Sequence, residues 1–583
     1  MAVRNTPPAV APEKARQRFT PKRQPRTVAR IALLAPLVVL GALAGGVARA
    51  ADDQAVATTI RSLLARPGNQ LMLRPPTAAE YQMLRAVYAA RDFRSLWGGT
   101  TPSRQATALL QTVRAADTFG LQPGDYAEAF EVAPRDRSTP DAVGQIQRSA
   151  LFDIQLSASS LRLITHLHYG RVDPRAAGFN LDRAHSELDP ALVLEQLATA
   201  RDLDTVISSV EPQFYHYRLL KETLMRYRAL ARDPSLATLP PPQQRPIKPG
   251  EPYAGAPQLR KLLHALGDLP DESGSRSTER TLDTALVAAL RRFQERHGLT
   301  PDGALGKATF AALTVPLAQR VRQIELTLER WRWLPAFTTP PIIVNIPQFK
   351  LFAFQSTQDR KAQILQMDVI VGRSYPGLLH TPVFAADMRY VVFRPYWDVP
   401  YSITQREMLP GIRANPGYLL KQHLEIVRGS GEATTALPAT PQNLSALASG
   451  TLRLRQQPGP DNALGLIKFM LPNTYNVYLH STPAHQLFSE SRRAFSHGCI
   501  RVSDPGALAA HVLRNAPGNW TPQTIAAAMN GPATLRVNLP KPIRVMILYG
   551  TVLATEAGTV LFFDDIYGHD RKLATLLHLP PPA

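Results

Sequence analysis

Cysteine is almost absent from this chain, which has a single one, Cys499, among 583 residues. One thiol cannot form a disulfide within the chain, so the fold is held together without internal disulfides. In an oxidising compartment an unpaired cysteine is accidental, intermolecular or reactive. The length is sufficient for three or four domains, each with a core of its own.

Familiar metal-binding patterns are absent as well. The sequence has no HExxH motif, and its candidate ligands follow the spacing H-x4-H-x11-H-x-C, which matches no familiar zinc pattern: His480, His485, His497 and Cys499. We therefore do not expect a metal, and a zinc site at these residues is the weaker alternative.

Acidic residues are outnumbered: 46 Asp and Glu face 66 Lys and Arg, which gives a formal net charge of +20. Residues 1–50 hold nine of the bases and one of the acids, so the rest of the chain carries +12. Such an excess suits an anionic polymer, such as nucleic acid, an acidic membrane surface or a cell wall. No compact block of Lys and Arg interleaved with aromatic residues follows residue 50, so we do not expect nucleic acid as a partner.

Long uncharged apolar stretches are scarce, and the one that stands out covers the 17 residues 31–47. It follows a basic segment and ends in Val47-Ala48-Arg49-Ala50, an arrangement typical of a secretory signal peptide. An uncleaved membrane anchor is the alternative, because about 17 apolar residues can just span a bilayer. Pro36 and several glycines in the run favour the signal peptide. In either case residues 1–50 predict export of the rest of the protein.

The segments that follow are mostly helical by their hydrophobic periodicity. Residues 51–238 predict a helical scaffold domain, in which apolar residues such as Tyr81 and Leu84 recur at three- and four-residue spacing. A proline-rich, extended linker is expected over 239–255. A connecting helix is expected over 317–340.

Residues 341–545 change to short β-rich runs with turn signals between them, which predicts a β-rich domain. Within it the pattern loosens over about 402–454; this is long for a connection, and we expect an inserted lid there. Strand-like runs at 542–549 and 559–563 predict a C-terminal β extension over 546–583. The expected fold class is multidomain α+β.

Residues 256–316 contain three short helical segments separated by turns. Leu286, Leu290 and Phe293 mark one face of the second helix, and Gly298 caps its end. The stretch resembles the small three-helix peptidoglycan-binding module through a set of short elements: Phe293-Gln294, Gly298-Leu299, Asp302-Gly303, Gly306, Thr309 and Leu313. The resemblance implies a cell-wall ligand, although such modules sometimes only brace a neighbouring domain.

The surroundings of Cys499 suit an activated thiol. His497 lies two positions before it, His480 nineteen positions before it, and Gly498 directly in front of it. An imidazole can accept the thiol proton, and the thiolate is the species that attacks a carbonyl carbon. A glycine lets backbone N–H groups come close to the developing oxyanion.

The spacing His480-x15-Ser496-His497-Gly498-Cys499-x-Arg501 resembles the active-site signature of the YkuD-type L,D-transpeptidases, which cross-link peptidoglycan. Supporting matches lie in several segments: 371–373, 380–382, 396–403, 455–459 and 462–473. With its helical part, module and insertion, the chain is similar to the large multidomain subgroup of Gram-negative bacteria. The resemblance implies a periplasmic enzyme, held at the inner membrane if residues 31–47 are retained.

Carried over to this sequence, the resemblance makes Cys499 the nucleophile and His480 its general base. The backbone carbonyl of Ser481 would fix the imidazole tautomer, and the N–H groups of Gly498 and Cys499 would form the oxyanion hole. His497 would either tune the thiol or hold the loop.

The resemblance also implies residues of the substrate cleft. Arg501 would bind a substrate carboxylate or lock the loop. Trp397 would line the cleft or, as the favoured reading, pack beneath it. The remaining members of this group are Tyr478, Ser402 and Ser496.

The implied reaction has two steps and needs no cofactor. Cys499 attacks a tetrapeptide stem of peptidoglycan at its third residue and expels D-alanine, and an amine of a second stem takes the acyl group to give a 3→3 cross-link. Water as acceptor would make the protein an L,D-carboxypeptidase, and a lipoprotein lysine would make it an anchoring enzyme. A non-catalytic wall-binding scaffold is a further alternative. Expected partners are peptidoglycan stems and other cell-wall synthesis enzymes.

Overall fold

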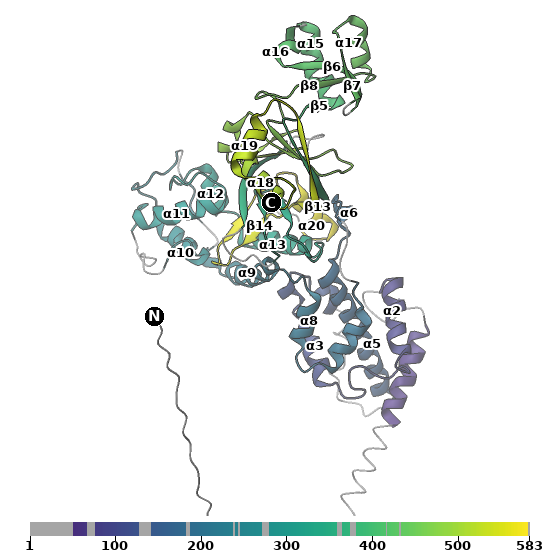
Figure 1. Ribbon diagram of the computed structural model, residues 1–583. Coiled ribbons are helices and arrows are strands. Elements are labelled where there is room, and N and C mark those ends of the chain that lie inside the picture. Colours follow the sequence, from purple (N-terminus) through teal and green to yellow (C-terminus); the bar gives the residue numbers. More distant parts are fainter. Residues whose placement is uncertain are drawn as a thin grey trace, which may run out of the picture.

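The computed structural model describes most of the chain beyond residue 50: 51–66, 76–127, 142–181, 187–236, 239–242, 245–270, 279–357, 364–373, 380–415, 417–430 and 433–580. Figure 1 shows a helical bundle, a small helical module, a central β-rich domain and a subdomain that projects from it. Residues 31–47, in which we expect a signal peptide or anchor, lie outside these ranges. Within them, no helix is long and apolar enough to cross a membrane.

The helical bundle begins with a helix over residues 51–64. It continues through α2 (Ala78–Ala89), α3 (Arg104–Arg114), the 3-10 turn η2 (Ala116–Phe119), α4 (Gly124–Ala127), α5 (Ala142–Tyr169), α7 (Pro190–Thr199) and α8 (Leu203–Val210). A capping box starts α2, because the Thr77 side chain accepts from the N–H of Glu80 and the Glu80 carboxylate accepts from the N–H of Thr77. The bundle shares one apolar core, which confirms the helical scaffold expected from the periodicity.

The core of the bundle ends at Val210, earlier than expected. The segment around α6 (Pro174–Ala177) and the long helix α9 (Tyr215–Ala231) contribute to the core of the β-rich domain instead. Helix α13 (Leu317–Trp331), expected only as a connection, packs along α9 and buries Ile324 in the same core. These helices therefore form a base for the β-rich domain.

Three helices make up the small module: α10 (Ala256–Leu266), α11 (Thr284–Arg296) and α12 (Lys307–Leu313). Leu286, Leu290 and Phe293 are buried as the spacing predicted. The module is attached to the rest of the protein by Arg296, which pairs with Asp268 and donates to the Val560 carbonyl at 2.9 Å.

Gln294 explains why the module has a recognisable sequence. Its side-chain nitrogen lies 3.0 Å from both the Ala304 carbonyl and the Thr309 hydroxyl, and its oxygen accepts from the Gly303 N–H at 2.8 Å. Gly303 has a φ of +75°, and a Cβ there would lie 2.8 Å from Val287. The short sequence elements of the module are therefore those that form a buried, hydrogen-bonded turn of its fold.

Nine strands form the main sheet in the order β11-β3-β12-β10-β9-β4-β13-β1-β2. Their bounds are β1 (Ile342–Asn345), β2 (Lys350–Ala353), β3 (Leu365–Gly372), β4 (Phe384–Phe393), β9 (Ile467–Met470), β10 (Leu479–His480), β11 (Ala494–Ser496), β12 (Ile500–Val502) and β13 (Leu535–Leu548). A further pairing of β2 with β3 closes eight of them into a barrel and leaves β11 outside, alongside β3. Burial alternates along β1 and β4, as it does in a barrel with a filled interior. The predicted β-rich domain is confirmed.

Two helices after β12 add to the barrel core. They are α18 (Pro505–Leu513) and α19 (Pro522–Asn530), which bury Leu508 and Ile525 respectively. The Asp504 side chain caps α18 by accepting from the N–H of Ala507 at 2.8 Å.

The C-terminal segment is an integral part of this domain. The strand-like run predicted at 542–549 belongs largely to β13, which lies between β4 and β1 in the barrel. The second run is β15 (Val560–Phe562), paired with β14 (Val552–Ala554) in a hairpin. A helix that we did not predict, α20 (His569–Leu576), follows and packs against α13.

The insertion in the barrel is a folded subdomain, not a loose segment. It has a four-stranded sheet in the order β5-β8-β6-β7, with bounds β5 (Trp397–Val399), β6 (Leu424–Ser430), β7 (Ala433–Leu437) and β8 (Arg453–Gln456). Helical segments cover it: α14 (Tyr401–Ile403), the π-helical turn η6 (Thr404–Met408), α15 (Leu409–Ala414), α16 (Gly417–Lys421) and α17 (Pro441–Ala448). Its own core contains Ile403, Leu409, Ile426 and Leu454, and it projects from the barrel in Figure 1.

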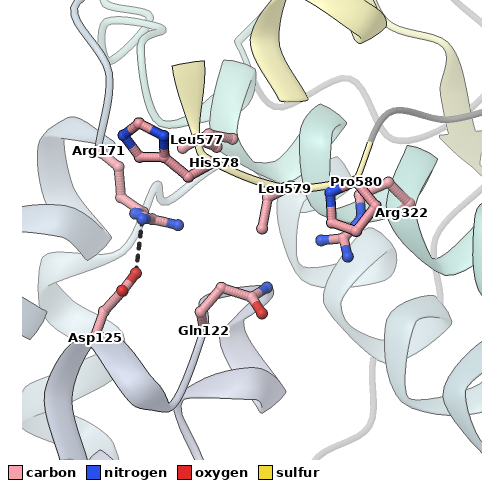
Figure 2. A pocket seen from close by; sticks show the side chains of 8 residues that line it. All are labelled: Gln122, Asp125, Arg171, Arg322, Leu577, His578, Leu579 and Pro580. Carbon is pink, nitrogen blue, oxygen red and sulfur yellow. Dashed lines mark ion pairs between the residues drawn. The ribbon is translucent and has the colours of Figure 1, made fainter. Parts of the chain in front are cut away.

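Two hollows lie at borders between these parts. A cavity of about 470 Å³ separates the helical bundle from the C-terminal tail, and Figure 2 shows Arg171 in it, paired with Asp125 at 2.7 Å. A groove of about 1140 Å³ lies between the three-helix module, the β14–β15 hairpin and residues 491–493. Cys499 lines neither of them.

Candidate active site

Parallel pairing of β10 with β12 brings the two halves of the signature together. His480 lies opposite Arg501 in this register, so Cys499, the residue before β12, lies beside Tyr478. The Ile500 N–H donates to the Tyr478 carbonyl at 3.1 Å. The chain between the two strands is looped out, so Cys499 and His480 come from neighbouring segments and lie two register positions apart.

His480 is oriented by its neighbour, as the resemblance implied. The imidazole is 4% exposed, and its Nδ1 lies 2.5 Å from the backbone carbonyl of Ser481. Only a protonated Nδ1 can donate to a carbonyl, so the neutral ring presents Nε2 as its basic nitrogen. Gly465 allows this arrangement, because a Cβ there would lie 2.6 Å from the Ser481 hydroxyl.

Burial disfavours the charged forms of both His480 and Cys499. Loss of solvation, reinforced by the positive Arg501, lowers the pKa of His480 to about 3. Burial raises the pKa of the Cys499 thiol, while Tyr478, Lys468 and Arg501 act in the opposite direction. Both shifts favour the uncharged forms, a thiol and a neutral imidazole, over a preformed thiolate–imidazolium pair. The thiol points to the Asn476 carbonyl, with the sulfur 3.6 Å from it.

Lys468 is a charged neighbour of the thiol to which sequence reasoning gave no role. It lies opposite His480 in the β9–β10 pair, and its ammonium is 3.8 Å from the centre of the Tyr478 ring. Burial lowers the pKa of Lys468, and the nearby Cys499 opposes that shift. In the sequence, the feature that could have pointed to Lys468 is a lysine within an otherwise apolar strand.

Of the two backbone N–H groups expected in the oxyanion hole, that of Gly498 is already hydrogen-bonded within the loop before Cys499. Gly498 has a φ of +112°, and its N–H donates to the Ser496 hydroxyl at 3.1 Å. The same hydroxyl donates to the Cys499 carbonyl at 2.5 Å. Within the described residues the Cys499 N–H makes no hydrogen bond, so it is the amide available to an oxyanion. Ser496, expected to contact substrate, is buried and occupied inside the loop.

Thr381 fixes the loop from the barrel side. Its side chain is fully buried, and its hydroxyl donates to the Gly498 carbonyl at 2.8 Å while accepting from the Gly372 N–H at 2.9 Å. The sequence offered Thr381 only as part of a matching segment, without a role.

His497 turns away from the barrel, toward the inserted subdomain. Its Nε2 lies 2.5 Å from the carboxylate of Glu407, on η6. Of the two roles considered for His497, this contact supports holding the loop. Sequence reasoning missed Glu407, because the partners are 90 positions apart.

Arg501 lies close to the thiol, and Arg373 lies close to Arg501. Arg501 is half-buried, and no described residue accepts a hydrogen bond from its Nε. Loss of solvation and the neighbouring positive Arg373 lower the pKa of Arg501, whereas Cys499 opposes this shift. Such an arrangement can bind a carboxylate in the cleft.

The remaining predicted residues lie where the subdomain begins. Trp397, at the start of β5, is half-buried and hydrogen-bonds the Tyr478 side chain, which in turn interacts with Cys499. Ser402 is exposed on α14, and no recorded contact connects it to Cys499. No three His, Cys, Asp or Glu side chains within the described ranges gather in a way that could hold a metal ion.

Comparisons with known families divide the chain in the same way. Residues 340–525 match the family described as L,D-transpeptidase catalytic domain. Residues 254–313 match the putative peptidoglycan binding domain family, and residues 82–224 match a scaffold domain family.

A curated relative covers part of the chain. It is named "Putative L,D-transpeptidase", from Haemophilus influenzae, and is 31% identical over 252 residues. The match covers 43% of this chain and 49% of the relative, so the chain spans about half of the length of that protein.

Proposed function

Because residues 340–525 match the L,D-transpeptidase catalytic domain family and residues 254–313 match a peptidoglycan-binding family, we propose that this protein forms 3→3 cross-links in peptidoglycan through a thioester on Cys499. We place the reaction in the periplasm, where the wall polymer and its other synthesis enzymes lie. The observation that carries the proposal is the strand register, which places Cys499 opposite Tyr478, two positions before an imidazole oriented by the Ser481 carbonyl.

In the first step the thiol attacks the carbonyl of the third residue in a tetrapeptide stem. His480 Nε2 takes the thiol proton as the S–C bond forms, and the Cys499 N–H binds the oxyanion. The C–N bond to D-alanine then breaks, and His480 passes its proton to the leaving amine. Arg501 is the candidate for binding a carboxylate of the stem.

In the second step an amine from another stem attacks the thioester. Its proton moves to His480 as the new C–N bond forms, and the C–S bond breaks to release the thiolate, which recovers the proton. The neutral pair of thiol and imidazole at rest suits this cycle, because His480 accepts a proton only when the sulfur attacks.

A direct test is to incubate the purified protein with disaccharide-tetrapeptides and analyse the products by mass spectrometry. We expect a cross-linked dimer with loss of one D-alanine, and no product from Cys499→Ala. Trimmed tripeptide without dimer would make the protein an L,D-carboxypeptidase instead. An added lysine peptide that becomes the main acceptor would favour lipoprotein anchoring.

The non-catalytic alternative makes a different prediction in the same assay. A wall-binding scaffold would bind peptidoglycan, and neither the wild type nor Cys499→Ala would change the muropeptides. Exposure to a carbapenem adds a second readout, because its reactive carbonyl should acylate Cys499 and add one carbapenem mass to the intact wild-type protein alone.

A further inference from the structure

The C-terminal segment returns to the catalytic loop after the barrel is complete. Tyr567 lies in the turn between β15 and α20, outside the residues 340–525 that match the catalytic family. Its hydroxyl donates to the Gly372 carbonyl at 2.7 Å and lies 3.3 Å from the Thr381 N–H, from which it accepts. One phenol therefore joins two backbone segments that flank the loop.

Thr381 relays this contact to the catalytic residues. Its hydroxyl accepts from the Gly372 N–H and donates to the Gly498 carbonyl at 2.8 Å. The carbonyl of Gly498 and the N–H of Cys499 belong to one peptide group, and in a trans peptide they point in opposite directions. A bond that fixes the carbonyl on the barrel side therefore aims the Cys499 N–H at the opposite side.

Tyr567 is itself firmly held. Its ring stacks on His380 with centroids 4.0 Å apart and planes 10° apart. Its N–H donates to the Tyr549 hydroxyl at 2.9 Å, and that hydroxyl donates to Asp565 at 2.7 Å. The phenol remains a neutral donor at physiological pH, because burial raises the pKa of Tyr567 to about 12.

We propose that Tyr567 is a positioning residue, which orients the Cys499 N–H of the oxyanion hole through Thr381 and Gly498. The inference rests on the proposed acyl transfer at Cys499. Since the Gly498 N–H is engaged by Ser496, the Cys499 amide is the loop donor whose direction matters, and the relay sets that direction.

Acyl transfer and alkylation, two reactions of the Cys499 sulfur, can distinguish a positioning role of Tyr567 from a role in the stability of the fold alone. Acyl transfer passes through an oxyanion, whereas alkylation by iodoacetamide displaces iodide at a saturated carbon and needs no oxyanion hole. In Tyr567→Phe, which keeps the ring and its stacking, we expect D-alanine release from disaccharide-tetrapeptide to slow about tenfold. The alkylation rate of Cys499 should stay within about twofold of wild type.

Matched variants complete the test. Thr381→Val should reproduce the Tyr567→Phe effect, Thr381→Ser should retain activity, and the double variant should be no slower than the slower single variant, because both act in one chain. Tyr390→Phe, at a tyrosine whose ring lies under Arg536 on the barrel, is the control and should match wild type.

The outcomes distinguish this inference from the proposed function. Unchanged D-alanine release in Tyr567→Phe, or equal losses of acyl transfer and alkylation, would overturn the positioning role while leaving the enzyme assignment intact. A wild-type protein that releases no D-alanine would instead remove the proposed function, and the inference with it.

Discussion

The two sides of the candidate active site differ in how deeply their residues are buried and in how many of their polar groups are hydrogen-bonded. On the barrel side His480, Gly498 and Thr381 are buried, and their polar groups are satisfied at fixed distances. On the subdomain side Ser402 and Glu407 are exposed, and among the described residues Glu407 contacts the loop before Cys499 by pairing with His497.

This difference leads us to link the barrel side to proton transfer and the subdomain side to substrate access. Burial displaces the pKa values of His480, Cys499 and Lys468, because the loss of solvation disfavours the charged form of each group. Exposed groups on the subdomain are screened by water and salt. We therefore expect variants on the barrel side to change the chemical step and variants on the subdomain side to change substrate capture.

The largest effect should come from His480→Gln, which removes the proposed general base and keeps a polar side chain. We expect the rate of D-alanine release to fall by about 10²–10⁴. His485→Gln is the matched control, because His485 is exposed on the short 3-10 turn η7 (His485–Ser489). If His480→Gln lost less than tenfold, the base would have to be a residue elsewhere, and the comparison between the two sides would fail.

On the barrel side, the sequence predicted the residues proposed for the reaction better than it predicted the residues that hold them in place. The family resemblance implied roles for Cys499, His480 and the Ser481 carbonyl, and the structure places all three at one strand pair. Thr381 and Tyr567 reach the loop from other segments, 117 and 195 positions from their partners Gly498 and Gly372, and no local pattern marks such contacts.

The subdomain side was predicted least well, and its sequence shows why. β7 has the sequence Ala-Thr-Thr-Ala-Leu and is mostly exposed, so it lacks the alternation of apolar and polar residues that marks a half-buried strand.

The barrel has one strand that was also hard to predict. β13 contains Pro540 and Pro542 at a register irregularity between Asn538 and Ile543, and prolines usually argue against a continuous strand.

An intermediate effect is expected from Lys468→Met, which removes a positive charge beside the thiol. Because that charge favours the thiolate, its loss should raise the pKa of Cys499 further above its ordinary value. In wild type, alkylation by iodoacetamide should keep rising with pH beyond the ordinary thiol pKa of about 8.5, and in Lys468→Met the curve should lie at higher pH. At pH 7 we expect alkylation to slow by about three- to tenfold.

Lys541→Met, at an exposed lysine of β13, is the control for lost positive charge and should leave the curve in place. An alkylation rate that is already maximal at neutral pH would show a preformed thiolate, contrary to the neutral resting pair. An unchanged curve in Lys468→Met would instead show that the role of Lys468 is structural.

The smallest effect should come from Glu407→Gln, which keeps a hydrogen-bond acceptor for His497 but removes the charge. An exposed pair of this kind contributes about 0.2–1 kcal/mol, so we expect KM for disaccharide-tetrapeptide to rise by less than about fivefold, with kcat unchanged. The difference from wild type should shrink as salt increases, because screening weakens the wild-type contact. Glu490→Gln provides an exposed glutamate outside the subdomain as a control. A large loss of kcat in Glu407→Gln, with alkylation of Cys499 slowed in parallel, would show that the subdomain takes part in the chemical step and would remove the distinction between the two sides.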